Sequence, residues 1–253
     1  MAHNIYKHGG CSGKKDFQTA KQLLIAMIGD ILLINDNHRR AARELAKKVL
    51  EHKSVKENEH NGHYKYVVGI SGESGAGKSE LSYSLALELK KQDIRVKVMH
   101  ADNYYLVPPL LRREWRMTHG VESVGMDEYD WEKVNQNIRD FREDRVSTLP
   151  YIDILSGQID TLTTDFQKIH LLVVDGLYAI RAEDIDLRVF IELTYLETKM
   201  AQLVRGKESH DDFRIRVLEK EHQNVLSLKP MADLLVNRDF EIKANPDKAA
   251  ART

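Results

Sequence analysis

Three glycines precede a lysine and a serine in the eight residues from Gly72 to Ser79, which read Gly-Glu-Ser-Gly-Ala-Gly-Lys-Ser. This order fits the pattern G-x-x-x-x-G-K-[S/T], with an apolar run before it and helix-like sequence after it. Glycine allows backbone conformations that other residues avoid, so successive amide groups can turn inward around phosphate groups. The stretch predicts a nucleotide-binding loop made of Gly72, Glu73, Ser74, Gly75, Ala76, Gly77, Lys78 and Ser79, with Glu80 beside it.

Lys78 and Ser79 have separate expected roles in such a loop. Lys78 would reach the outer phosphates of a nucleotide, and the Ser79 hydroxyl would bind Mg²⁺. A glycine-rich turn with no ligand is the alternative, but the flanking strand and helix patterns favour nucleotide binding. We therefore expect ATP and Mg²⁺ as cofactors, with another nucleoside triphosphate left open as the donor.

Two aspartates end apolar runs that read as strands, Asp102 in "IRVKVMHAD" and Asp175 in "LLVVDG". The carboxyl ends of parallel strands meet at one edge of a sheet, so both carboxylates should lie beside the phosphate loop. Asp102 is placed to accept the proton of an attacking hydroxyl, unless it serves only as a helix cap or turn residue. Asp175 is placed to hold Mg²⁺, directly or through water.

The residues around these aspartates narrow the reaction class. Gly176 follows Asp175 where many hydrolytic ATPases carry a glutamate that activates water, which disfavours a hydrolytic motor. The string Asn237-Arg238-Asp239 lacks the N-K-x-D pattern by which GTPases of the Ras type read guanine. A small-molecule kinase is the class that the sequence favours.

A basic segment at about 196–216 reads as a helix–loop–helix that could close over the phosphates as a lid. Arg205 is the first choice for a phosphate clamp and a catalytic role, because a guanidinium binds phosphate in bidentate fashion. A solvated basic helix face is the alternative. The cations of this segment are Lys199, Arg205, Lys207, Arg214 and Arg216.

The composition disfavours a nucleic-acid-binding, secreted or membrane-spanning protein. The chain carries 38 Lys and Arg against 39 Asp and Glu, a balance that gives no overall attraction to nucleic acid or anionic membranes. The single cysteine, Cys11, cannot form an intrachain disulfide, which fits a cytoplasmic location. The N-terminus lacks the apolar core of a signal peptide, and the run from Leu23 to Leu33 is too short to span a bilayer.

Alternating strand and helix patterns predict an α/β fold of the P-loop NTPase type, a three-layer sandwich around a mainly parallel sheet. We expect a helical N-terminal extension over 1–63, in which Asn37 caps the second helix, and an α/β domain over 64–253. An insertion at about 106–169 should build the substrate pocket, with a hairpin that turns near Ser156 and Gly157. The apolar N-terminal stretch could pack on the domain, cover its active site or form a homodimer interface.

The combination of motifs resembles the uridine kinase and phosphoribulokinase family over about 64–242. The family's D-x-F-Y motif corresponds to Asp102-Asn103-Tyr104-Tyr105, and its E-G-I motif corresponds to Asp175-Gly176-Leu177. Its "ADIIV" stretch near the adenine resembles 232–236. The resemblance implies ATP-dependent phosphorylation of a small-molecule hydroxyl, with Asp102 as the catalytic base.

The chain departs from the uridine kinases where those enzymes hold a pyrimidine. Their D-H-P-D-A-F-D stretch is replaced by 124–130, which keeps the acids and one aromatic residue, and their P-x-Y-D-F-x-x-H motif is only partly kept at 150–157. We therefore expect a sugar-, polyol- or nucleoside-like acceptor; a uridine or cytidine kinase with an altered pocket and an inactive nucleotide-binding regulator are the alternatives. The candidates for holding the acceptor are Tyr104, Tyr105, Asp127, Asp130, Tyr151 and Asp153. Arg112, Arg113 and Arg116 could bind an anionic acceptor, with an exposed helix face as the alternative.

Overall fold

The computed structural model describes residues 32–153, 156–198 and 211–250. The chain divides into two compact units, 1–32 and 33–253, and every described residue except Leu32 belongs to the second unit. Most of the predicted helix over the N-terminal apolar run, with the dimer interface considered for it, lies outside the described residues, and residues 32–34 at its end are not helical.

The centre of the described structure is a six-stranded sheet in the order β2-β5-β1-β6-β7-β8. All pairings in it are parallel except that of β7 with β8, which confirms the predicted α/β fold with a mainly parallel sheet. The strands are β1 (Tyr66–Gly72), β2 (Val96–His100), β5 (Leu171–Gly176), β6 (Leu187–Ile191), β7 (Leu234–Val236) and β8 (Ile242–Ala244).

Both faces of this sheet are covered, which explains the continuous apolar runs in its central strands. Tyr66, Val68 and Ile70 of β1 belong to one buried cluster, and Val67 belongs to another on the opposite face. Successive side chains of a strand alternate between faces, so a strand between two helical layers is buried at every position. The central strands are therefore held firmly, and their carboxyl ends form a fixed edge for a site.

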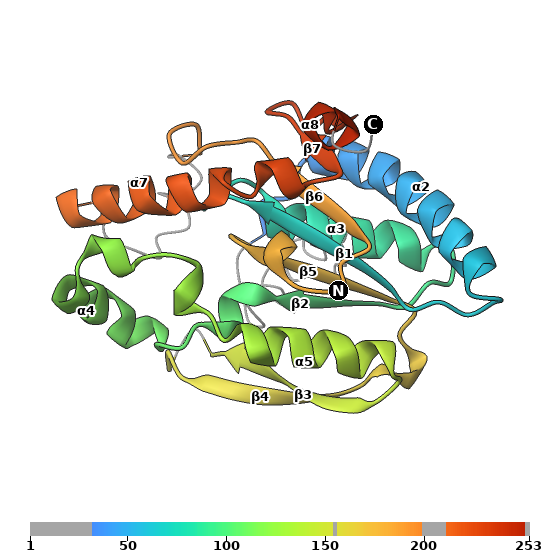
Figure 1. Cartoon of the computed structure of the whole chain (residues 1–253), viewed down its shortest axis with the longest axis horizontal. Coiled ribbons are helices and arrows are strands. Elements are labelled where there is room, and N and C mark those ends of the chain that lie inside the picture. The colour runs from blue at the N-terminus through green and yellow to red at the C-terminus, as the bar shows by residue number, and fades with distance from the viewer. Residues whose placement is uncertain (1–31, 154–155, 199–210, 251–253) are drawn as a thin grey trace, which may run out of the picture. The chain divides into compact units, whose positions relative to one another are not determined.

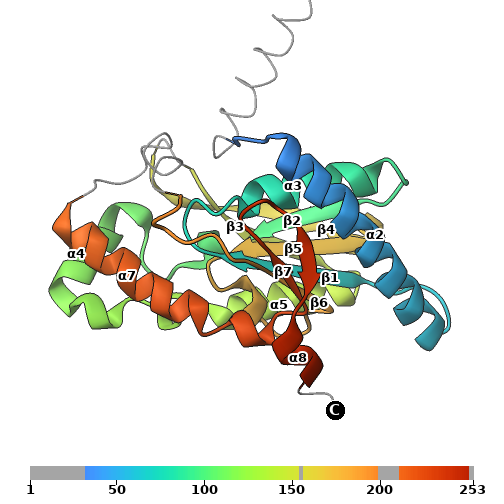
Figure 2. The ribbon, with the colours of Figure 1, turned by 90° about the horizontal axis from the view of Figure 1, so that it is seen from above.

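Helices α2 (Asp36–Glu59) and α3 (Lys78–Lys90) cover one face of the sheet, and α5 (Trp131–Arg142) and α7 (Asp212–Leu226) lie on the other (Figures 1 and 2). The apolar stripe predicted on α2 is confirmed, since Ala41, Ala42, Leu45, Ala46 and Val49 are all buried. A short helix, α8, spans Pro246–Ala250.

The predicted cap of α2 was wrong by two residues. Asn35, not Asn37, caps the helix: its side chain accepts a hydrogen bond from the His38 amide, and the His38 side chain accepts one from the Asn35 amide. This reciprocal pair satisfies two backbone donors at once, which a cap at Asn37 could not do because Asn37 already lies in the first turn.

The insertion contains two helices, α4 and α5, and the expected hairpin. Helix α4 spans Pro109–His119, and the antiparallel strands β3 (Val146–Ile152) and β4 (Ile159–Asp165) form a separate two-stranded sheet. Gly157 stands in the turn with a positive φ of 67°, where a β-carbon would meet Leu110 of α4 at 2.5 Å. Short 3-10 helices occur at Ala101–Tyr104, Val121–Ser123, Met126–Glu128, Phe166–Lys168, Ala179–Arg181 and Lys229–Met231.

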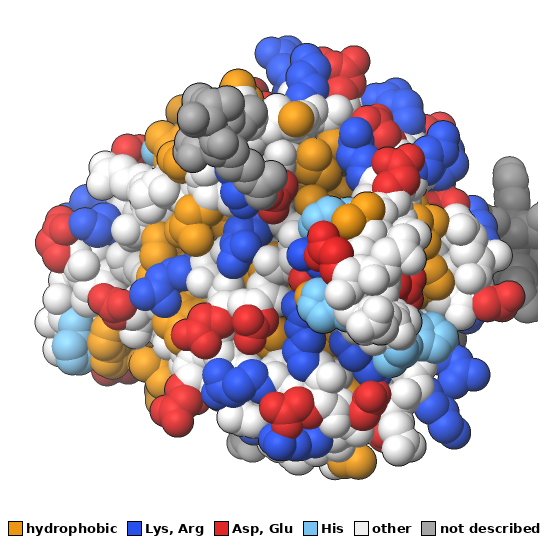
Figure 3. All heavy atoms as spheres, turned by 45° about the vertical axis from the view of Figure 1, so that its right-hand side comes forward, with side chains coloured by type: hydrophobic (Ala, Val, Ile, Leu, Met, Phe, Trp, Pro, Cys, Tyr) orange, Lys and Arg blue, Asp and Glu red, His pale blue; other side chains and the backbone are white. Residues whose placement is uncertain are grey.

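The surface view in Figure 3 shows basic and acidic side chains interspersed over the visible face. This mixture agrees with the balance of 38 cationic and 39 anionic residues in the sequence. Among the described helices, none combines the length and apolar character needed to cross a membrane.

Candidate active site

The glycine-rich segment forms the turn between β1 and α3, as its pattern predicts (Figure 1). Gly75 and Gly77 have positive φ angles of 79° and 87°, a backbone region that residues with a β-carbon rarely adopt. Gly72 is required for a different reason, because a β-carbon there would lie 3.1 Å from the carbonyl oxygen of Ile191 in β6. The geometry leaves successive amide groups at the start of α3, where an anion is favoured.

Lys78 lies in the first turn of α3 and is 8% exposed. Its Nζ donates a hydrogen bond to the carbonyl oxygen of Glu73 at 2.9 Å, so the side chain crosses back over the loop. Ser79 is the next residue in the same turn and is half-buried. The two residues thus stand together at the mouth of the loop.

Two acidic residues predicted in the nucleotide site hold neighbouring elements by their side chains. Glu73 Oε2 accepts the amide of Tyr195 at 2.7 Å, and its Oε1 lies 2.7 Å from Nδ1 of His222 in α7. Glu80 is buried, and its Oε1 accepts the amide of Leu33 at 3.1 Å. These contacts connect the loop and α3 to the segments around them.

Asp175 is the second-to-last residue of β5 and is 2% exposed. Burial opposes its ionisation, but His100, whose Nδ1 lies 2.6 Å from Oδ1, and Lys78 outweigh burial and hold the pKa of Asp175 below its usual value. Its other oxygen, Oδ2, is buried without a hydrogen-bond partner among the described residues. An ionised carboxylate with one unsatisfied oxygen is what a hard cation requires.

The donor set near the loop fits Mg²⁺ in a nucleotide complex. Within the described residues, no group of three or more His, Cys, Asp or Glu side chains could hold a metal by itself. Mg²⁺ commonly uses one or two protein oxygens together with phosphates and water, which Ser79 and Asp175 are of the right type to supply. The residues present therefore fit a metal that arrives with its nucleotide.

Asp102 follows β2 directly and lies beside Asp175, because β2 pairs with β5 so that His100 stands opposite Asp175. A β-carbon at Gly176 would lie 3.2 Å from Asp102 Oδ1, so this glycine permits the close approach. Asp102 is exposed, and His100 rather than Asp102 occupies the cap position of the short helix at 101–104. The carboxylate is therefore accessible to solvent at the carboxyl edge of the sheet.

Tyr129 anchors this carboxylate, a role that the sequence analysis did not find. Its hydroxyl donates to Asp102 Oδ1 at 3.0 Å, and the residue is only 3% exposed. Burial raises the pKa of Tyr129 well above its usual value, so the phenol keeps its proton and remains a donor. A signal was present: Tyr129 replaces the phenylalanine of the family's D-A-F-D stretch and so adds one hydroxyl.

The predicted acceptor residues fall into different environments. Tyr105 is buried, with its ring centroid 4.1 Å from that of Tyr129, whereas the hydroxyl of Tyr104 donates to Asn137 of α5 at 2.8 Å. Asp130 caps α5 by accepting the amide of Lys133. Asp127 is exposed and lines a surface hollow of about 500 Å³ together with Arg181, Lys220 and residues of the insertion.

Tyr151 and Asp153 lie at the tip of the hairpin and are half-buried. The Asp153 carbonyl accepts the amide of Gly157 at 2.7 Å, so Asp153 closes the turn. Arg205, the predicted phosphate clamp, and the rest of 199–210 lie outside the described residues.

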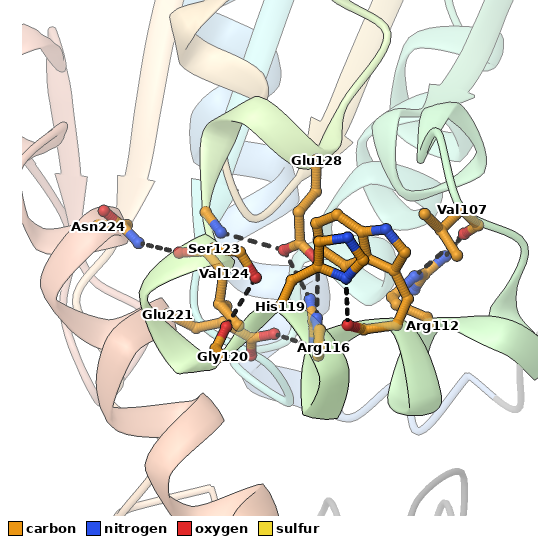
Figure 4. Close-up of polar contacts among 12 residues, drawn as sticks. Val107, Arg112, Arg116, His119, Gly120, Ser123, Val124, Glu128, Glu221 and Asn224 are labelled. Atoms are coloured by element: carbon orange, nitrogen blue, oxygen red, sulfur yellow. Dashed lines mark hydrogen bonds and ion pairs between the residues drawn. The ribbon is translucent and has the colours of Figure 1, made fainter.

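The three arginines of α4 have separate roles. Arg116 is 5% exposed and donates to both oxygens of Glu128 at 2.7 and 2.8 Å and to Glu221 at 3.1 Å (Figure 4). Arg113 pairs with Asp211 at 2.5 Å. Arg112 instead stacks on the ring of Tyr105, with its Cζ 3.5 Å from the ring centroid. The expectation of an anion-binding group is thus wrong for Arg116, whose charge is neutralised internally, and stays open for Arg112.

Comparison with known proteins agrees with this geometry. The profile of the "Phosphoribulokinase / Uridine kinase family" matches residues 67–209. A bifunctional alpha-galactosidase/sucrose kinase of Mediterraneibacter gnavus is 27% identical over 198 residues, which cover 72% of this chain and 21% of that protein. A uridine kinase of Ureaplasma parvum is 24% identical over 140 residues, which cover 54% of this chain and 66% of that protein.

The matched part of the chain thus spans about a fifth of the first relative and about two thirds of the second. Among solved structures, D-glycerate 3-kinase from Cryptococcus neoformans aligns with a TM-score of 0.56 at 15% identity, covering 80% of this chain and 98% of that one. At this identity the likeness concerns the fold.

Proposed function

We propose that this chain, which belongs to the phosphoribulokinase / uridine kinase family, is a kinase that transfers the γ-phosphate of ATP to a hydroxyl group of a small molecule. The observation that carries the proposal is the meeting of three groups at the carboxyl ends of adjacent parallel strands. The phosphate loop follows β1, Asp175 lies near the end of β5, and Asp102 follows β2. This arrangement supports a donor site at the loop with Asp102 as the base.

On the donor side, the loop from Gly72 to Ser79 binds the phosphates through its amide groups, and Lys78 adds positive charge. Mg²⁺, when bound, would be held by Ser79 and Asp175 and would neutralise charge on the phosphates. We propose that Arg205 binds the transferred phosphoryl group, because a guanidinium can donate two parallel hydrogen bonds to phosphate oxygens.

On the acceptor side, Asp102 accepts the proton of the acceptor hydroxyl as that oxygen bonds to the γ-phosphorus and ADP leaves. Tyr129 occupies Oδ1 of Asp102, which directs the other carboxylate oxygen toward the acceptor. A carboxylate fixed in one orientation needs less reorganisation as the proton is transferred. Tyr129 is thus a positioning residue in this scheme.

We propose a sugar-, polyol- or nucleoside-like acceptor, held by a subset of the predicted residues. Tyr105, Asp127, Tyr151 and Asp153 remain candidates, whereas the hydroxyl of Tyr104 and the carboxylate of Asp130 serve structural bonds. The relatives named above include a sucrose kinase and a uridine kinase, so membership of the family does not fix the acceptor.

An acceptor that carries an anionic group is a second candidate, supported by Arg112. Among the described residues its guanidinium has no carboxylate partner, and it stacks on Tyr105 beside the Tyr129–Asp102 pair. Arg113 and Arg116, from the same helix, are both paired with acids.

The test is a phosphorylation assay of the full chain with ATP and Mg²⁺ over nucleosides, sugars, polyols, hydroxy acids and sugar phosphates. We expect phosphorylated product, detected by mass, from one of these classes. Lys78→Ala should lose turnover and weaken nucleotide binding, because it removes the cation of the loop. ATP binding without product from any class would favour a nucleotide-binding regulator, and the absence of ATP binding would overturn the proposal.

A further inference from the structure

Helix α2 lies outside the residues that match the family, yet its first turn reaches the phosphate loop. A β-carbon at Gly77 would lie 2.8 Å from Nε2 of His38 in α2 and 2.8 Å from Cζ of Phe240. His38 and Phe240 are each 6% exposed, so both rings are packed against this glycine rather than pointing to solvent. The loop is thus supported from its outer side by two rings that come from opposite ends of the chain.

The orientation of His38 is fixed by the cap of α2. The Asn35 amide donates to Nδ1 of His38 at 3.1 Å, and the His38 amide donates to the side chain of Asn35 at 3.0 Å. An imidazole that accepts through Nδ1 presents Nε2 on its opposite side, and Nε2 is the atom nearest Gly77. The capping box therefore positions the ring as well as starting the helix.

Phe240 contacts Gly77 from a strained backbone conformation. Its φ is +58°, a left-handed conformation that is uncommon for a bulky residue and persists only where the surroundings enforce it. Asn237 Oδ1 accepts hydrogen bonds from the amides of Asp239 and Glu241 and so shapes this turn. Arg40 of α2 donates to the Asp239 carbonyl at 2.6 Å and so joins the turn to the helix.

The two rings meet edge to face, with centroids 4.4 Å apart and an interplanar angle of 79°. Gly75 and Gly77, at positive φ, belong to the residue type with the greatest backbone freedom, so the loop needs external support to keep one shape. A loop already in its binding conformation loses less entropy when a ligand binds.

We infer that His38 and Phe240 are positioning residues for the phosphate loop and that the N-terminal helix α2 thereby raises the affinity of the chain for nucleoside triphosphate. The inference rests on the proposed function only in requiring that the loop bind nucleotide. It assigns α2 a part in the donor site that acts through the shape of the loop.

The test is a calorimetric titration of the full chain with ATP in the presence of Mg²⁺, which needs no acceptor. His38→Ala should raise the Kd for ATP on the order of five- to tenfold, the loss expected when one supporting ring is removed. His38→Phe keeps a ring against Gly77 and should recover most of the affinity.

His52→Ala is the matched control, because His52 lies on the same helix and makes a similar edge-to-face contact with Tyr66, at 5.6 Å and 83°. It should lower the melting temperature as His38→Ala does and leave the Kd for ATP unchanged. Phe240→Gly is the second variant, since glycine adopts the same φ without strain and so removes the ring while retaining the turn. It too should weaken ATP binding, even if His38→Ala does not fold.

The possible outcomes separate the two ideas. If the native chain binds ATP and Phe240→Gly and folded His38→Ala bind it equally well, the inference fails and the proposed function stands. The inference also fails if His52→Ala weakens binding as much as His38→Ala, because the effect would then be one of general stability. If the native chain does not bind ATP, both fail together.

Discussion

Two tyrosine–aspartate pairs lie at opposite edges of the same sheet and have different surroundings. At the carboxyl edge, the Tyr129 hydroxyl donates to Asp102 at 3.0 Å; at the amino edge of β1, the Tyr64 hydroxyl donates to Asp186 at 2.7 Å. Asp186 also accepts the amide of Val67 and a guanidinium N–H of Arg142, at 2.7 and 2.9 Å. Asp102 is exposed, whereas the Asp186 side chain is only 6% exposed.

Similar tyrosine–aspartate bonds leave one carboxylate fully engaged and the other accessible. Each oxygen of Asp186 is engaged by at least one structural donor, so this carboxylate joins β1, α5 and the segment before β6. Asp102 is held by a single tyrosine at one oxygen and is open to solvent at the sheet edge where the phosphate loop also begins. Of the two carboxylates, only Asp102 is accessible, which is what the proposed role of base needs.

The largest effect should come from removing each carboxylate in turn. Asp102→Asn should lower kcat by about 10²- to 10⁴-fold, the range for loss of a general base, with the Kd for ATP unchanged. Asp186→Asn should leave kcat near the native value but destabilise the fold by about 2 kcal/mol, because Arg142 loses a charged partner in a largely buried site. The assays are steady-state kinetics with the identified acceptor and urea unfolding. Near-native turnover in Asp102→Asn would remove Asp102 from the role of base.

The second-largest loss of turnover should come from Tyr129→Phe, which removes the hydroxyl and keeps the ring. We expect kcat to fall about tenfold, equal to ~1.4 kcal/mol of transition-state stabilisation. The KM for ATP should not change, because the hydroxyl is bonded to Asp102 and not to the phosphate loop. A parallel rise in the KM for ATP, or an unchanged kcat, would show that Tyr129 only supports packing.

How far these features could be predicted depends on how local their signals are. The phosphate loop, Asp102 and Asp175 each follow or end an apolar strand, and a parallel sheet brings such strand ends together whatever the details of packing. Fold class and the core of the site were therefore accessible from short stretches of sequence.

The contacts that were missed join distant segments. Tyr129 is separated from Asp102 by 27 residues, and its ring direction depends on how the insertion folds back. Phe240 and His38 meet Gly77 through tertiary packing that no periodicity encodes. The sequence left Arg116 open as an anion-binding residue or part of an exposed helix face, because its actual partners, Glu128 and Glu221, lie 12 and 105 residues away.

A smaller effect should come from Tyr64→Phe, the structural counterpart of Tyr129→Phe. It removes a hydrogen bond to a charged group at a half-buried site, so the free energy of unfolding should fall by about 1 kcal/mol. Turnover should be unaffected, since Asp186 keeps its bonds to Val67 and Arg142. Paired kinetics and urea unfolding of the two variants would test the contrast, and a loss of turnover in Tyr64→Phe would contradict it.

The smallest effect concerns alkaline pH. Burial raises the pKa of Tyr105, Tyr129 and Tyr178 above the ordinary value for tyrosine, so the folded state binds these protons more tightly than the unfolded state. This contribution to stability is complete below a pH of about 10, the unfolded value, and is lost as pH rises above it. Replacing Tyr129 with phenylalanine removes one such group. The free energy of unfolding of the variant, measured with urea, should therefore fall less steeply between about pH 10 and 11 than that of the native chain. An equally steep decline would mean that the Tyr129 phenol ionises in the folded state at its ordinary pKa, and a phenol of that kind could not hold Asp102 as a permanent donor.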